Sequence, residues 1–443
     1  TFQRLSRFSH LSSIASWDMF TMMPPGGSAA RGEALAEMSV LQHQILTDKK
    51  VGDLLAAAAG EDLNDVEQAN LREMTRHYQQ ATLLPESLVE AKSLAGSKCE
   101  HAWRTQRPAN DWQGFSANLK EVVKLSREEA RLRAEAKGCT PYDALLDIFE
   151  PDMTSARLDV LFGDMKSWLP DLLANVVEKQ AQRSFIPPQG PFPTATQREL
   201  GLEAMKMLGF DFNGGRLDVS AHPFCGGVPE DVRITTRYDE DELLSALFGV
   251  IHETGHARYE QNLPRAWAGQ PVALARSTAI HESQSLFFEM QLGRSKAFLT
   301  RLIPAVTRHF GDQAAFEESN FIAWNQQVKP GFIRVDAVCN ARHQGVAAAG
   351  IEHRKLNRGR TAVNYQYNRK LNHHVTPLFL SNGLEQFVND IQNGQQAHNR
   401  DEDVLGFALI FRHGWRFADG VHRQQAQQRG DDRCAHGFDK VEN

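Results

Sequence analysis

DELLSALFGVIHETGHARYEQ, residues 241–261, is the stretch that decides the fold class and the chemistry of this chain. Its first half is strongly apolar, and its residues favour a helix that is buried on most sides. The apolar positions ahead of the histidines are Leu243, Leu244, Leu247, Val250 and Ile251. His252 and His256 follow four residues apart, just over one helical turn, so a helix projects both imidazoles from one face.

The motif His252-Glu253-Thr254-Gly255-His256 has the HExxH pattern of zinc hydrolases. Neutral imidazoles are standard zinc ligands, and Glu253 on the adjoining side can reach a water molecule that the metal activates. The simpler alternative is an ordinary helix that carries two histidines and binds no metal. On so apolar a helix, however, unpaired polar groups are costly to bury, and a metal ion supplies the missing partner. The stretch therefore favours metal-assisted hydrolysis.

A catalytic zinc site commonly has a third protein ligand, and the next predicted helix, residues 273–295, offers two candidates. Glu282 lies 26 residues after His256, about the distance for a helix end, a loop and the start of a returning helix. Glu289 competes with it one heptad later. His281 either supports a ligand from behind or caps the helix.

Charge and composition exclude several classes of protein. The chain carries a net charge of −6 and five scattered cysteines without a CxxC pair, which is typical of reduced thiols in a cytoplasm and not of a disulfide framework. No run of about 18 apolar residues is present, so we expect no membrane span. The N-terminal segment lacks the apolar core of a signal peptide, which also favours a cytoplasmic protein.

Helical periodicity dominates the chain, and the predicted fold class is mainly α. Residues 28–180 are expected to form successive amphipathic helices, and helices resume from Asp241 to about Gln327. The only strand signals, residues 216–220 and 231–238, flank the Gly- and Pro-containing segment 221–230 and predict a short β-hairpin. We therefore expect a helical zincin-like body over residues 1–336, with a small hairpin near the active site.

Several motifs in chain order resemble the carboxypeptidase Taq family of metallocarboxypeptidases. The segments are SWDMFTMMPPGGSAARGEAL (16–35), YDALLDIFEPDMT (142–154), HPF (222–224), the DxRxT pattern of Asp231, Arg233 and Thr235, HETGHARYEQ (252–261), HESQ (281–284) and most of IRxxAD at 333–337. Together they cover the chain from near Ser16 to about Ala337. So many motifs in the same order are far more specific than HExxH alone.

The resemblance implies a zinc-dependent carboxypeptidase that hydrolyses the C-terminal peptide bond of peptides with broad specificity. His252, His256 and Glu282 would be the zinc ligands, and Glu253 the general base. Arg334, Arg233 and His222 would bind substrate, since arginine suits a free C-terminal carboxylate. The resemblance also implies a deep groove, a cytoplasmic homodimer, and Co²⁺ as a substitute for Zn²⁺.

The resemblance stops where the composition changes. Residues 1–336 carry 35 basic and 44 acidic residues, a net charge of −9, whereas residues 337–443 carry 14 and 11, a net charge of +3. Val338 stands where IRxxAD ends in Asp, and no GxxQDxHW segment follows. The abrupt change favours a frameshift-like tail over a divergent natural one, and its histidines and arginines are weak signals for nucleic acid.

Two alternatives to an active carboxypeptidase follow from this departure. The first is a zinc-binding relative whose catalysis is impaired because the C-terminal motifs of the family are missing. The second is an HExxH oligopeptidase that cleaves internal peptide bonds. Amino-acid release from a free C-terminus, compared with the C-terminal amide, distinguishes these activities.

Overall fold

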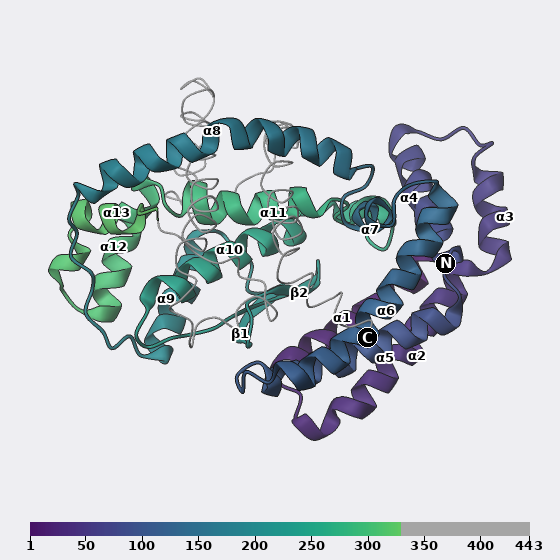
Figure 1. The fold of residues 1–443 in the computed structure, drawn as a ribbon, viewed down its shortest axis with the longest axis horizontal. Coiled ribbons are helices and arrows are strands. Elements are labelled where there is room, and N and C mark those ends of the chain that lie inside the picture. The colour runs from purple at the N-terminus through teal and green to yellow at the C-terminus, as the bar shows by residue number, and fades with distance from the viewer. Residues whose placement is uncertain (329–443) are drawn as a thin grey trace. The chain divides into compact units, whose positions relative to one another are not determined.

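The computed structural model describes residues 1–328, and these confirm a mainly helical chain with one small sheet (Figure 1). The described residues form two compact units whose segments alternate along the sequence. The first comprises Thr1–Ser155, Gly226–Arg233 and Glu260–Ser277. The second comprises Ala156–Cys225, Ile234–Tyr259 and the described residues from Thr278 onward.

Helices that were predicted from periodicity make up most of the first unit. Its elements are α1 (Phe2–Thr21), η1 (Pro25–Gly27), α2 (Ser28–Thr47), α3 (Lys49–Ala58), α4 (Asp65–Thr82), α5 (Glu86–Gln106), α6 (Trp112–Lys137), α7 (Pro141–Phe149), η2 (Arg265–Trp267) and η3 (Pro271–Ala273). Asn64 caps α4 in a capping box with Glu67, and Gly138 ends α6 with a positive φ of 66°. Helix α5 packs against α2 and α6.

Two buried carboxylates in the first unit each contact two basic side chains. The pairs are Glu129 with Lys92 and Arg133, and Asp147 with Arg76 and Lys137. Glu129 and Arg133 lie one turn apart on α6 at 2.8 Å between Oε1 and Nη2. These ion pairs join α4, α5, α6 and α7, so the carboxylates are compensated within the helical bundle.

The second unit is built around helix α10. Its elements are α8 (Ser155–Ala181), α9 (Thr194–Met207), β1 (Gly215–Val219), α10 (Leu243–Gln261), α11 (Thr278–Leu286), the π-helical segment η4 (Phe287–Leu292), α12 (Lys296–Phe310), η5 (Ala314–Phe316) and α13 (Glu318–Asn325). Side chains from α9, α10, η4, α12 and α13 form one apolar core. Phe248 and Ile251 of α10 are almost fully buried in that core.

The sheet differs from the predicted hairpin by one strand. The segment expected to be a turn contributes β2 (Cys225–Val228), which leads through Pro229 and Glu230 into β3 (Asp231–Thr236), and the strand order is β1-β3-β2. Gly227 has a φ of +86°, and a Cβ there would collide with the carbonyl oxygen of Asp231. Two adjacent glycines carry little strand propensity, so the sequence alone favoured a loop.

Among residues 1–328, no helix combines the length and apolar character that crossing a bilayer requires. The domain boundary predicted after residue 336, the tail 337–443 and Arg334 lie outside the described residues. The predicted deep groove stays a prediction.

Candidate metal centre

Helix α10 presents both histidines of the HExxH motif from one buried face. Glu242 precedes the helix, and its carboxylate accepts hydrogen bonds from the backbone N–H groups of Leu244 and Ser245, which caps the first turn. Most residues from the start of α10 to the motif are buried, which matches the apolar pattern of the sequence. Glu253 is 5% exposed, whereas the side chains of His252, His256 and Glu282 are 13%, 15% and 31% exposed, so the ligands lie at a partly accessible place on a largely buried helix.

Gly255, inside the motif, lets α11 approach α10 closely. A Cβ at this position would lie 2.6 Å from Cα of Ser285 and 2.8 Å from the carbonyl oxygen of Gln284, distances that real Cβ atoms do not adopt. Only glycine therefore permits this contact. The close approach brings Glu282, one turn earlier on α11, to the face that carries His252 and His256.

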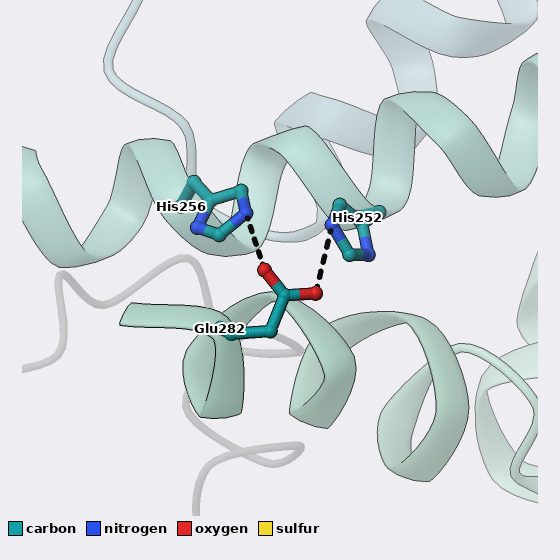
Figure 2. Close-up of side chains that lie close together, drawn as sticks. All are labelled: His252, His256 and Glu282. Carbon is teal, nitrogen blue, oxygen red and sulfur yellow. Dashed lines mark ion pairs between the residues drawn. The ribbon is translucent and has the colours of Figure 1, made fainter. Parts of the chain in front are cut away.

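The three predicted metal ligands converge on one point (Figure 2). Nε2 of His252 lies 3.6 Å from Oε1 of Glu282, and Nε2 of His256 lies 3.4 Å from Oε2 of the same carboxylate. One ligand atom from each residue lies within 4.8 Å of the other two. Ligand atoms about 2.0–2.2 Å from one tetrahedral zinc ion are about 3.4 Å apart, so the donor set and its spacing fit such an ion.

Both imidazoles are also contacted at their other ring nitrogen. Oε2 of Glu289 lies 2.9 Å from Nδ1 of His252, and Nδ1 of His281 lies 2.6 Å from Nδ1 of His256. Glu289, weighed from the sequence as a competing ligand, thus touches His252 on the side away from Glu282. His281, for which the sequence left two roles open, contacts a predicted ligand from behind. Sequence spacing offered Glu289 only as an alternative third ligand, one heptad after Glu282, and gave no sign of its contact with His252.

The charges of the centre shift the pKa values of its groups in opposite directions. Burial lowers the pKa of His252, but the hydrogen bond and charge of Glu289, with the charges of Glu253 and Glu282, outweigh it and raise that pKa to about 9. Burial lowers the pKa of His256, and its hydrogen bond with Glu282 does not compensate. Burial raises the pKa of Glu282, but both histidines outweigh this and lower it.

Neither Arg233 nor His222, the predicted substrate-binding residues that the structure describes, is among these three ligands. Arg233 belongs to the first unit, where its guanidinium makes a bidentate pair with Asp231 at 2.6 and 2.9 Å and stacks 4.5 Å from the ring centre of Trp17. His222 lies between β1 and β2, and its carbonyl oxygen accepts a hydrogen bond from the hydroxyl of Ser220. Arg334 lies outside the described residues. Their roles toward substrate stay predictions.

Comparison with known proteins matches this geometry to a family. The model of the carboxypeptidase Taq (M32) metallopeptidases matches residues 1–338. Thermostable carboxypeptidase 1 of Thermus thermophilus is 37% identical over 352 residues, which cover 76% of this chain and 68% of that protein. Carboxypeptidase 1 of Bacillus subtilis is 34% identical over 344 residues, with 76% and 67% covered.

A solved structure agrees with the sequence comparisons. Trypanosoma cruzi metallocarboxypeptidase 1 has a TM-score of 0.71 and 41% identity, with 97% of this chain and 86% of that chain covered. The fold, the HExxH helix and the converging third carboxylate thus occur in a chain whose relatives are carboxypeptidases. This chain belongs to the carboxypeptidase Taq (M32) family of metallopeptidases.

Proposed function

We propose that this chain is a zinc carboxypeptidase whose metal is held by His252, His256 and Glu282 and whose general base is Glu253. The observation that carries the proposal is the convergence of two Nε2 atoms and one carboxylate, at the spacing of a tetrahedral site, in a member of a metallopeptidase family. An impaired zinc-binding relative and an oligopeptidase are less favoured, since the relatives compared are named carboxypeptidases.

Zinc bound at this site lowers the pKa of water and polarises the scissile carbonyl group. Glu253, next to His252 on α10, takes the proton of the attacking water and returns it to the leaving amine. His252 and His256, as ligands on one helical face, would hold the metal next to Glu253.

We propose that Arg334, Arg233 and His222 recognise the free C-terminal carboxylate and the adjoining peptide. Arginine presents a planar fork that matches a carboxylate. Arg233 is already paired with Asp231, so we expect it to act as half of a fixed Arg–Asp unit while Arg334 binds the carboxylate directly. Replacing Arg334 with Ala should raise KM more for peptides with a free C-terminus than for amidated ones.

The decisive test is Glu253→Gln with zinc content measured in the same samples. We expect kcat on a peptide with a free C-terminus to fall by about 10²–10⁴-fold while zinc stoichiometry stays unchanged. The exposed Glu178→Ala on α8 is the matched control and should keep full activity. Equal cleavage of the peptide and its C-terminal amide contradicts a carboxypeptidase, and unchanged kcat in Glu253→Gln contradicts the general base.

We further propose that Co²⁺ supports activity in place of Zn²⁺, and that the protein works as a cytoplasmic homodimer on peptides, with no role for nucleic acid or membranes. The donor set of two imidazoles and one carboxylate supports the metals, because both ions accept these ligands. Light scattering of the zinc-loaded chain tests the dimer. Activity after exchange of zinc for cobalt tests the second metal.

A further inference from the structure

Glu289 is a buried carboxylate that the proposed mechanism does not use. Its side chain is 12% exposed, and Oε2 lies 2.9 Å from Nδ1 of His252. The same imidazole faces Glu282 with its other nitrogen, Nε2. The imidazole of His252 therefore lies between two carboxylates from the same chain segment, and each carboxylate faces a different ring nitrogen.

The backbone after α11 explains how both carboxylates reach one ring. Seven residues separate Glu282 from Glu289, and in an α-helix this spacing is about two turns on nearly the same face. Helix α11 continues into the π-helical segment η4, which begins at Phe287 and holds Glu289 in its first turn. Such segments widen a helix locally and recur at functional sites. The continuous helical segment thus sets two acidic side chains against His252.

A second contact holds the carboxylate of Glu289 in place. Nη2 of Arg294 lies 3.9 Å from Oε1, the oxygen that does not face His252. The Arg294 guanidinium is itself fixed, 4.0 Å above the ring centre of Phe248 and donating to the backbone carbonyl of Asn325 at 2.6 Å. Glu289 therefore has a cationic neighbour at one oxygen and faces the imidazole of His252 with the other.

The geometry assigns Glu289 as a positioning residue of the metal centre. Its carboxylate accepts the Nδ1–H of His252, which fixes the tautomer and the ring orientation that present Nε2 to the metal. Carboxylates placed in this way behind a ligating histidine typically contribute about 10–100-fold to metal affinity. His256 has a different partner, the imidazole of His281, so a carboxylate contacts one ligand from behind and an imidazole contacts the other. The assignment rests on the proposed function.

Zinc affinity of the full chain tests the assignment without reference to activity. Dissociation constants are measured by competition with a chromogenic chelator for Glu289→Ala, Glu289→Gln and the exposed control Glu178→Ala. We expect about 10–100-fold weaker zinc binding in Glu289→Ala, a smaller loss in Glu289→Gln, and no change in the control. The amide oxygen of Gln still accepts the Nδ1–H, which explains the partial rescue.

Unchanged zinc affinity in Glu289→Ala, or equal losses in Ala and Gln, would overturn the assignment. If Glu289→Ala does not fold, as far-ultraviolet circular dichroism reports, the nearly isosteric Glu289→Gln decides the question: its zinc affinity must fall measurably below that of the parent chain. Failure of the proposed function looks different. In that case Glu282→Ala keeps stoichiometric zinc, whereas failure of this inference alone leaves Glu282→Ala without zinc and Glu289→Ala unaffected.

Discussion

Two groups of charged side chains in this protein are assembled in opposite ways. In the first unit, Glu129 and Asp147 each contact two basic side chains, so positive charge exceeds negative charge around them. In the second unit, Glu282 faces two imidazoles, and no lysine or arginine among residues 1–328 makes an ion pair with it. The first group is electrostatically complete, while the second provides donors for a cation.

This difference in charged partners distinguishes carboxylates that stabilise the fold, Glu129 and Asp147, from Glu282, which we propose to bind metal. A carboxylate taken out of water needs compensating positive charge. Lysine and arginine supply it in the first group, whereas imidazoles supply it to Glu282 and leave ring nitrogens that a bound cation could use. Helices supply both groups, so secondary structure does not distinguish them, although the side chain of Glu282 is 31% exposed against 6% for Glu129 and 11% for Asp147. The balance of charge among the contacts of each carboxylate also distinguishes the two groups. The following substitutions test that contrast, from the largest expected effect to the smallest.

Removal of Glu282 should have the largest effect, because it takes away one of three proposed ligands. At zinc concentrations about 1,000-fold above the dissociation constant, bound zinc stabilises the folded chain by about 4 kcal/mol. We expect Glu282→Ala to abolish the zinc-dependent rise in unfolding temperature seen in scanning calorimetry, while Glu178→Ala keeps it. An equal rise in both variants would contradict the ligand role.

Glu129→Ala should destabilise the chain by about 3–5 kcal/mol, because it leaves Arg133 buried without its carboxylate and removes the partner of the partly exposed Lys92. Urea unfolding followed by circular dichroism measures this free energy. Zinc affinity should remain unchanged, since the helices that carry the centre belong to the other unit. Glu128, the exposed neighbour on α6, gives the control Glu128→Ala, expected to change stability by about 0.5 kcal/mol or less.

Gly255→Ala tests whether close helix packing assembles the metal centre. The added methyl group must displace the backbone of α11, which we expect to cost about 1–3 kcal/mol and to weaken zinc binding by separating Glu282 from the histidines. Gly163→Ala is the matched control, because a Cβ there meets nothing within 4 Å in the middle of α8. It should slightly stabilise the helix. Zinc affinity unaffected by Gly255→Ala would argue against this packing.

Low pH should reduce the free energy of unfolding that the ion pairs of Glu129 and Asp147 contribute. Burial raises the pKa of Glu129 and of Asp147, but their hydrogen bonds and charge pairs with lysine and arginine outweigh it and lower both values. A lowered folded-state pKa contributes stability that is complete above the ordinary carboxyl value of about 4 and disappears as pH falls through the lowered one. The unfolding free energy should therefore drop in acid, and less steeply in Glu129→Gln.

In the metal-free chain, high pH should reduce the free energy of unfolding that the interactions of His252 contribute. The folded-state pKa of His252 is raised to about 9, so its contribution is complete below the ordinary value of about 6.5 and is lost as pH rises through about 9. Urea unfolding of the metal-free chain across this pH range should show a decline in the free energy of unfolding. The decline should be smaller in Glu289→Gln. A flat profile would contradict the charge contrast between the two groups.

Local pattern was sufficient to predict much of this protein. The periodicity of residues 241–261 predicted α10, and the spacing of His252 and His256 placed both rings on one face because helical geometry is local. The usual ligand number of zinc predicted a third ligand but left Glu282 and Glu289 open. The ordered motifs predicted the family, and that resemblance favoured Glu282. Helices α1 and α9 were not singled out, and β2 was taken for a turn, because weak local preferences there are overridden by packing.

What the sequence determined by itself is the set of chemical groups and the helical face on which α10 presents them. Only tertiary structure decided which groups meet. The contact of Glu289 with His252, that of His281 with His256, and the close approach at Gly255 join residues 25 to 37 positions apart. Such contacts depend on how α11 packs against α10, and packing is a property of two surfaces that no local pattern in either segment contains.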